Sequence, residues 1–144
     1  MNGTGFNSLV KKEFAFLLND FKFRIIKEKF EPALMGNAAV ILMSSSVVLS
    51  IVKDRGQVLI NIGEVLSSRD EWLEFTDVVR FFAANESLDV YQFGVNPYDV
   101  PPVEKQLSRL AILMREYCSP MLRGDFSMKN KIKSLEEELK HASH

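Results

Sequence analysis

The stretch NAAVILMSSSVVLSIVKDRGQVLINIG, residues 37–63, indicates the fold class, because it contains three short runs of strand-forming residues and two polar breaks. The breaks are Ser44-Ser45-Ser46 and Asp54-Arg55-Gly56, and breaks of this kind join consecutive antiparallel strands. They leave no room for a crossover helix, which excludes a parallel arrangement. The predicted strands are Ala38 to Met43, Val47 to Lys53 and Gln57 to Ile62.

The three runs differ in how their apolar residues are placed. In the third run, Val58, Ile60 and Ile62 alternate with less apolar positions, which predicts one buried face. The first two runs are apolar at almost every position, as is typical of central strands that are at least partly covered on both sides. We therefore expect these two runs to pair at the middle of the sheet.

Another strand is predicted before this stretch, starting at Phe21. Phe21, Phe23 and Ile25 alternate with Lys22 and Arg24, which gives one apolar and one charged face. The alternation slips at Ile25-Ile26. This slip predicts either a β-bulge, after which Ile26 and Phe30 change faces, or the end of the strand.

Helical periodicity and caps predict the remaining elements. Ser68 and Glu71 have the spacing of a capping box, so we expect a helix to begin there and to run to Ala84. Asp125 or Ser127 is expected to cap a last helix. Residues 88–94 are consistent with either an edge strand or an ordered loop. The other predicted helices are Ser8 to Leu18 and Val103 to Cys118.

Together these elements predict an α+β fold. We expect a mainly antiparallel meander of about four strands, with the N-terminal helix and three C-terminal helices packed against it. The helices over 8–18 and 103–118 carry the largest apolar stripes, so both are expected on one face of the sheet. The length of 144 residues fits one domain, 1–144, with fraying expected at 141–144.

Composition restricts the classes of partner. The net charge is −1 and 26% of residues are charged, so no bulk field attracts nucleic acid or an anionic membrane. The most apolar window, Ala38 to Val52, contains serines and is shorter than the ~20 residues of a membrane helix. We expect neither nucleic-acid nor membrane binding.

Cysteine usage and the N-terminus predict a cytoplasmic protein. Cys118 is the only cysteine, which is typical of a reducing compartment, and its place on an apolar stripe predicts a buried, inert thiol. Residues 1–7 lack the basic and apolar segments of a signal peptide. Asn2 stands where N-myristoylation requires glycine.

No catalytic constellation is recognisable in the sequence. The only histidines, His141 and His144, lie at the C-terminus, which argues against an internal triad or a histidine-rich metal site. Gly3-Thr4-Gly5 lacks the lysine and hydroxyl residue of a phosphate loop. We therefore expect no enzymatic activity and no cofactor. A small-molecule-binding domain or a carboxylate-based enzyme is one alternative, and a homo-oligomeric structural domain is another.

Partner-binding residues are expected on the second face of the sheet. If Val58, Ile60 and Ile62 face the core, Leu59 points the other way. One of two alternating sets on the neighbouring strand must join it there, with Lys22 and Arg24 bordering the same face. These sets are Val48 and Val52, or Val47, Leu49 and Ile51.

Two further expectations concern the margins of this surface. The last helix, whose apolar stripe is narrow, is expected to cover part of it. An aromatic and acidic loop with Tyr91, Tyr98 and Asp99 is expected to complete an interface for another protein or for a second copy of the chain.

Three segments resemble a loosely defined group of small bacterial cytoplasmic proteins, some of which are immunity proteins of toxin systems. The segments are Phe14-Ala15-Phe16-Leu17-Leu18 leading into a strand rich in phenylalanine, the hairpin end Val58 to Gly63, and Leu110-Ala111-Ile112-Leu113 followed by Leu122 to Ser127. The resemblance implies a compact, non-enzymatic protein that binds another protein, such as a toxin domain that it blocks. It transfers no active-site residue to this chain.

Overall fold

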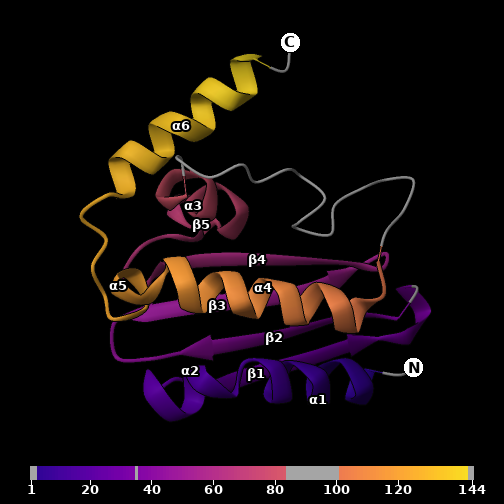
Figure 1. The fold of residues 1–144 in the computed structure, drawn as a ribbon. Coiled ribbons are helices and arrows are strands. Elements are labelled where there is room, and N and C mark those ends of the chain that lie inside the picture. The colour runs from indigo at the N-terminus through magenta and orange to yellow at the C-terminus, as the bar shows by residue number, and fades with distance from the viewer. Residues whose placement is uncertain (1–2, 35, 84–100, 143–144) are drawn as a thin grey trace.

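The computed structural model describes the backbone of residues 3–34, 36–83 and 101–142, and the side chains of 5–33, 36–83 and 101–138. Its centre is one antiparallel sheet whose spatial order, β1-β2-β3-β4-β5, is the order along the chain (Figure 1). The fold is therefore α+β with a β-meander, as predicted, although five strands are present rather than about four. The strands are β1 Arg24–Glu31, β2 Asn37–Met43, β3 Val47–Asp54, β4 Gln57–Glu64 and β5 Leu73–Glu74.

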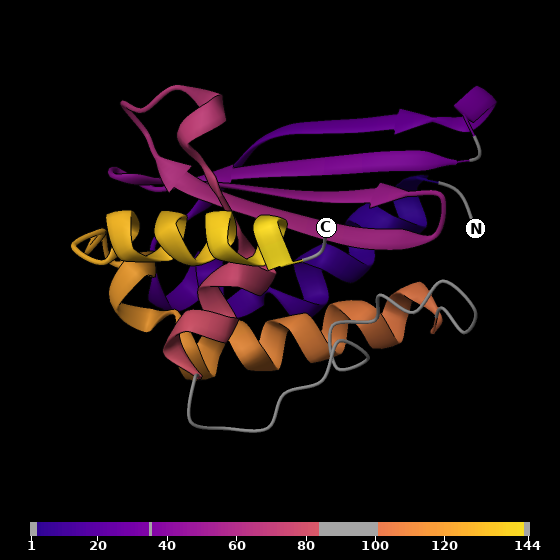
Figure 2. The ribbon, with the colours of Figure 1, turned by 90° about the horizontal axis from the view of Figure 1, so that it is seen from above.

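The helices cover one face of this sheet, which we call the inner face. Helix α1 contacts β1 and β2, α4 packs on β4 and against α1, and α3 lies beside β4 (Figure 2). The prediction that the first and third predicted helices share one face is confirmed. The helical elements are α1 Gly3–Glu13, α2 Ala15–Asp20, η1 Pro32–Leu34, η2 Arg69–Glu71, α3 Phe75–Phe82, α4 Val103–Tyr117, α5 Ser119–Leu122 and α6 Lys129–Ala142.

The two predicted turns set the register of the three central strands. Between β2 and β3, Ser44 donates its backbone N–H to the Val47 carbonyl over 2.8 Å, and its Oγ accepts from the Val47 N–H at 3.1 Å. Between β3 and β4, Arg55 and Gly56 have φ values of 53° and 83°. Positive φ at both central residues makes a type I′ turn, whose twist suits a hairpin. Asn37 supports this turn, since its side chain accepts from the Arg55 N–H at 3.0 Å.

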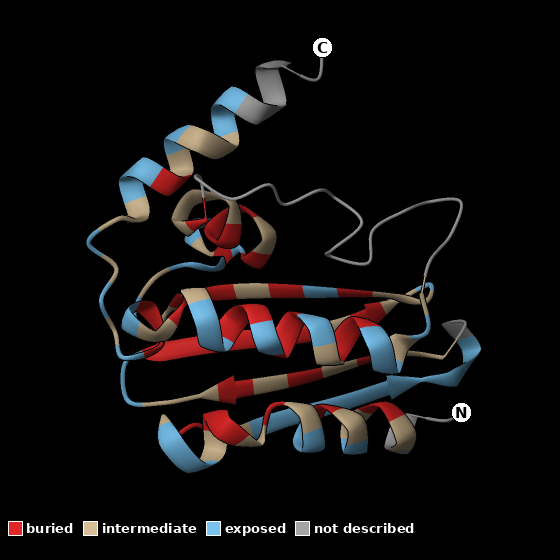
Figure 3. Ribbon diagram, viewed as in Figure 1, coloured by how far each residue is buried: buried red, intermediate tan, exposed pale blue. Residues whose placement is uncertain are grey.

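The inner face carries the core. Val58, Ile60 and Ile62 of β4 are buried there, as predicted, opposite Leu49 and Ile51 of β3. Figure 3 shows buried positions on the central strands and on the sides of α1 and α4 that meet the sheet. The helices contribute Phe6, Val10, Leu107, Leu110 and Met114 to this core.

The segment after β4 differs from its prediction. Residues 69–71 form only one 3-10 turn, and the Ser68 side chain makes no cap hydrogen bond to it. Leu73 then pairs with Ile62 as part of β5, and helix α3 begins at Phe75. The capping-box prediction was wrong because Leu73 is buried by extending the sheet, which a helix starting at Ser68 would prevent.

The N-terminal elements also shift relative to their predictions. The first helix begins at Gly3 and is interrupted at Phe14, after which α2 continues to Asp20. Lys22 has a φ of 63°, and β1 starts at Arg24 rather than at Phe21. The pairing of β1 with β2 skips one residue at Ile26, so the bulge is the correct one of the two alternatives.

The last helix does not cover the second face of the sheet, which corrects another prediction. Helix α6 packs against α3 and β5, on the helical side of the molecule (Figures 1 and 2). Lys129 holds it there, with its Nζ 3.4 Å from a Glu64 carboxylate oxygen, and Ile132 is fully buried. The turn before α6 is closed by Asp125, which accepts the Ser127 N–H at 3.0 Å. None of the described helices combines the length and apolar character needed to cross a membrane.

Candidate functional site

The face of the sheet opposite the helices is the candidate site, and we call it the open face. Antiparallel pairing places directly opposed residues on the same side, so the register defines the residues of this face. They form four rows that run across β1 to β4. The rows are Arg24-Met43-Val48-Gly63, Lys27-Ile41-Ser50-Asn61, Lys29-Ala39-Val52-Leu59 and Glu31-Asn37-Asp54-Gln57.

The centre of the open face is largely apolar, although Ser50 and Asn61 also belong to it. Val52 lies opposite Leu59, and Leu59 is 42% exposed. Ile41 and Met43 of β2 are half-buried beside them. Alternate residues of β3 point to opposite faces of the sheet. The register places Val48 and Val52 on the open face, so this is the correct one of the two predicted sets. In Figure 2, none of the described α-helices lies over these strands on this side.

The segment between β4 and β5 forms one border of the open face. It rises above the sheet (Figure 2) and returns so that the ring of Trp72 lies on Gly63. A Cβ at position 63 would overlap this ring, so the contact requires glycine. Arg69 lies over the other part of the same ring, with its Cζ 5.3 Å from the centroid. Leu66, in the same segment, is 99% exposed.

Strand β1 forms the opposite border, which is basic. Arg24, Lys27 and Lys29 all point to the open face and are exposed. Glu28 lies between them in sequence but points to the other side, where Lys11 of α1 is 3.4 Å from it. The three cations form no ion pair with any residue that the structure describes. Arg24 borders the face as expected, whereas Lys22 precedes the strand.

A depression of about 360 Å³ lies toward the turn end of the open face. Its floor is low because Ala39 and Val52 are small, and the longer side chains of Leu59 and Lys29 flank them in the same row. Asp54, at its rim, accepts from the Asn37 side chain at 3.2 Å. The depression can therefore receive an apolar group beside a polar rim.

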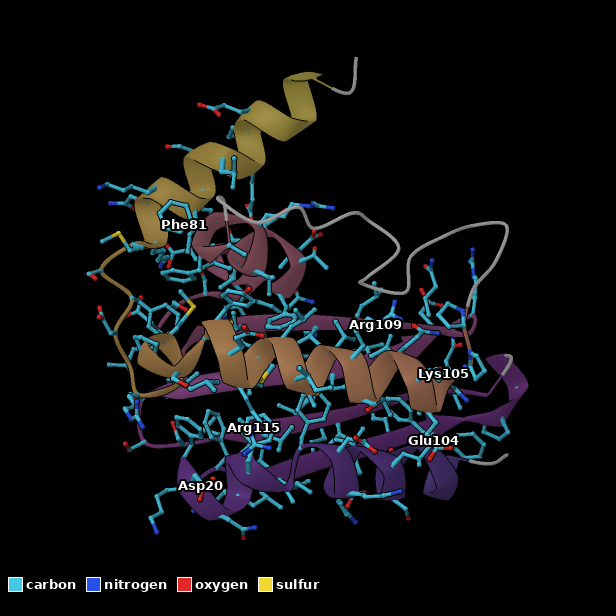
Figure 4. All side chains as sticks on the ribbon, viewed as in Figure 1. Asp20, Phe81, Glu104, Lys105, Arg109 and Arg115 are labelled. Carbon is cyan, nitrogen blue, oxygen red and sulfur yellow. The ribbon has the colours of Figure 1, made fainter. Side chains whose placement is uncertain are left out.

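The helical side of the molecule is different in character. Its exposed surface over α4 is polar, with Glu104, Lys105, Arg109 and Arg115 projecting from the helix (Figure 4). Arg115 is engaged with α2, since its Cζ lies 5.2 Å from the ring centroid of Phe16. A hollow of about 190 Å³ between β4 and α3 is lined mostly by apolar residues and by one carboxylate, Glu74.

Titratable groups elsewhere have structural roles. Burial raises the pKa of the Cys118 thiol to about 12, so the predicted inert thiol is confirmed as buried and protonated at neutral pH. A hydrogen bond from Ser127 lowers the pKa of Asp125, and one from Ser68 lowers that of Asp70. Asp77 is buried, but its carboxylate lies 3.4 Å from the Arg80 guanidinium. In the described part of the chain, no three His, Cys, Asp or Glu residues form a group that could hold a metal ion.

The predicted interface residues fall into two groups. Val48, Val52 and Leu59 share the open face, as the register shows. Tyr91, Tyr98 and Asp99, like the segment 88–94, lie outside the described residues. Val48 is buried beside the Gly63–Trp72 contact, so it supports the surface without being exposed on it.

Sequence reasoning missed several residues of this face. Lys27 and Lys29 lie after the bulge, where the alternation of faces begins again. Applying this alternation from Lys27 onward would have placed both on the open face. Trp72 directly follows the Ser68 and Glu71 pattern that predicted a helix, and only the β4–β5 pairing brings it over Gly63. No protein-family model, curated protein or solved structure matches the chain.

Proposed function

We propose that the chain is a non-enzymatic protein-binding module that docks its partner on the open face. The observation that carries this proposal is a sheet face with an apolar centre that no described helix covers, on which Leu59 is 42% exposed. Uncovered apolar faces bordered by polar residues are typical of protein interaction sites. In the cytoplasm, such a module would act as an immunity-type protein that binds a toxin domain and covers the surface on which the toxin's activity depends.

The size of the open face supports this proposal. Four strands about 4.8 Å apart and seven residues of about 3.3 Å each make a face of roughly 20 Å by 23 Å. Side-chain relief and the segment 65–72 enlarge the area that a partner can bury, and a standard interface buries about 800 Å² on each side. Leu66 and Trp72 add an apolar edge to the same surface.

Two alternatives use the same surface differently. The rim of the depression carries the carboxylates of Glu31 and Asp54 with the amine of Lys29, and these groups suit a small polar ligand. In the other alternative, two copies of the chain pack their open faces together. Both alternatives predict that substitutions on the open face change ligand binding or self-association of the purified chain, with no other protein present.

Affinity capture from lysates of the native organism tests the proposal. The immobilised wild-type protein should retain a specific protein, and Leu59→Glu should lose it. The matched control is Ile112→Glu, because Ile112 is 60% exposed on the opposite side of the molecule. Both variants must show unchanged circular-dichroism melts. Leu59→Thr, which introduces a β-branched side chain suited to a strand, provides a second test if Leu59→Glu unfolds.

A captured protein is then tested for toxicity. Expressing it alone should stop growth, and expressing it with the wild-type chain should restore growth, whereas the Leu59 variant should not. Equal capture by the wild type and by both Leu59 variants would place the interface elsewhere. A concentration-dependent dimer in sedimentation, abolished by Leu59→Glu, would instead support self-association.

A further inference from the structure

We infer that the open face receives an acidic amphipathic helix of the partner. Its apolar stripe would lie on Ile41, Met43 and Val52, and a row of its carboxylates would face the cations of β1. This inference rests on the proposed protein-binding function and names the chemistry of the partner. It is argued from the charge, dimensions and borders of the open face.

The charge pattern selects an acidic partner. Arg24, Lys27 and Lys29 stand in one line along β1, exposed and without ion pairs to described residues. The carboxylate nearest to them in sequence, Glu28, is on the inner side with Lys11 at 3.4 Å. Glu31 follows only in the last row, at the turn end of the strand. A partner therefore meets a positive line that no described residue of the chain compensates, and such lines favour partners of opposite charge.

The spacing of these cations suits a helix. Alternate residues of a strand lie about 6.6 Å apart, and helix residues i and i+4 lie about 6 Å apart along the axis. A helix aligned with β1 can therefore place carboxylates at i and i+4 against Lys27 and Lys29. The next carboxylate of the helix, at i+8, would lie near Arg24. Arg24 is separated from Lys27 by the bulge at Ile26.

The width of the face also suits one helix. The line of cations on β1 and the Leu59 line on β4 are three strand spacings apart, about 14 Å, and a helix with its side chains is about 10 Å across. The floor between these lines is supplied by β2 and β3, and its small residues, Ala39 and Val52, form the depression. The segment with Trp72 and Leu66 closes the far border. An added helix would convert a two-layer structure into three layers, a common architecture.

An extended peptide fits this face less well. Additional strands join a sheet at its edge, because only there are backbone groups unpaired. The residues of the floor belong to β2 and β3, and each of these strands is paired on both sides. Recognition on the open face must therefore use side chains, as an amphipathic helix does.

The test uses two synthetic 18-residue helical peptides stabilised by a hydrocarbon staple. Both carry Leu with helical spacing on one stripe. The first has Glu at i, i+4 and i+8 on the flank of this stripe, and the second has Lys at these positions. Titration into the isotope-labelled protein should give saturable amide shifts with the Glu peptide, confined to β1, β2, β3 and β4. The Lys peptide should bind at least tenfold more weakly.

Charge reversal on β1 provides the second readout. Lys27→Glu with Lys29→Glu should weaken binding of the Glu peptide about tenfold and strengthen binding of the Lys peptide, because reversal replaces each attraction by a repulsion. The control, Lys105→Glu with Lys131→Glu, makes the same change in net charge at exposed positions of α4 and α6. It should leave both affinities within about twofold.

Three results would overturn the inference: no shifts at millimolar Glu peptide, equal binding of both peptides, or shifts confined to the helical side. These outcomes are distinguishable from failure of the proposed function. If Leu59→Glu abolishes capture of the native partner while the β1 reversal does not, the open face is an interface but its partner is not acidic. If neither change affects capture, the proposed function itself fails.

Discussion

The two faces of the sheet are made by the same strands, yet only one of them is closed. Strand β3 sends Leu49 and Ile51 into the core and Ser50 and Val52 to the open face. Both sets contain aliphatic residues, so the hydrophobicity of β3 alone does not distinguish the faces. The difference lies in the helices, because α1, α3 and α4 pack on the inner side and α6 packs against α3. A strand that is apolar on both faces thus indicates that either face of the sheet can be buried. In this chain the described helices bury one of them.

Truncating one leucine on each face gives the largest expected contrast. Leu49 is fully buried, so Leu49→Ala should reduce the free energy of unfolding by about 3 kcal/mol through lost transfer energy and a cavity. Leu59 is partly exposed, so Leu59→Ala should cost about 1 kcal/mol or less. Urea denaturation measures both. Similar losses for the two variants would mean that the open face is covered.

The next contrast concerns two glutamines near the start of β4. Gln106 of α4 is buried, and its amide accepts the Val58 N–H at 2.8 Å and donates to the carbonyls of Gly56 and Pro101, each at 2.8 Å. It therefore replaces a strand partner at this sheet edge. Gln106→Leu should cost about 2 to 3 kcal/mol, because these backbone groups lose their partner.

The control for that change is Gln57→Leu, since Gln57 lies in the last row of the open face and its side chain makes no hydrogen bond to a described residue. It should alter stability by about 0.5 kcal/mol or less. Hydrogen exchange of the Val58 amide separates the two roles, since it should accelerate only in Gln106→Leu. Unchanged exchange in that variant would contradict the edge-capping role.

A smaller effect is expected where the segment 65–72 meets the open face. Gly63→Ala places a methyl group against the Trp72 ring, which must move away from β4. Displacement of a packed ring should cost about 1 to 2 kcal/mol and expose the indole. Trp72 is the only tryptophan, so its emission maximum should shift to the red in the folded variant. An unshifted spectrum would show that the ring does not rest on Gly63.

The smallest effect at neutral pH is expected for the core thiol. The pKa of Cys118 rises from 9.0 in its ordinary state to about 12 in the fold. Above pH 9 the unfolded chain loses this proton while the folded chain keeps it. The unfolded state then binds fewer protons, so the free energy of unfolding falls as the pH rises toward 12. Cys118→Ala should lose this part of the slope and leave the slope below pH 8 unchanged.

A thiol reagent provides an independent check. Ellman's reagent should label the native protein at pH 8 only as fast as it unfolds, and the denatured protein immediately. Fast labelling of the native protein would contradict a buried thiol.

Local patterns were enough to predict the centre of the sheet. The polar breaks at 44–46 and 54–56 predicted both turns, and Val58, Ile60 and Ile62 predicted which face of β4 is buried. These features depend on interactions between residues close in sequence, so the sequence carries their signal directly. The opposite orientation of Leu59 followed from the same alternation.

Features that depend on distant contacts were predicted less well. The pattern of Ser68 and Glu71 is a correct helix signal in isolation, but pairing of Leu73 with Ile62 prevails and moves the start of α3 to Phe75. The position of α6 was also predicted wrongly, because its narrow stripe suits either face and its salt bridge to Glu64 joins residues far apart in the chain. Which of two possible local structures or packing positions is adopted depends on the burial of side chains by residues distant in sequence. A local sequence pattern carries no information about this burial.

The sequence by itself therefore determined the meander, its turns and the alternation that makes two faces. Only the tertiary structure decided that α6 packs on the helical side, that Val48 and Val52 lie with Leu59 on the open face, and that Trp72 borders this face. The physical reason is that strand alternation is a property of neighbouring residues. Which apolar face becomes covered depends on the combined packing of helices that are distant in sequence, and here that packing leaves one face open.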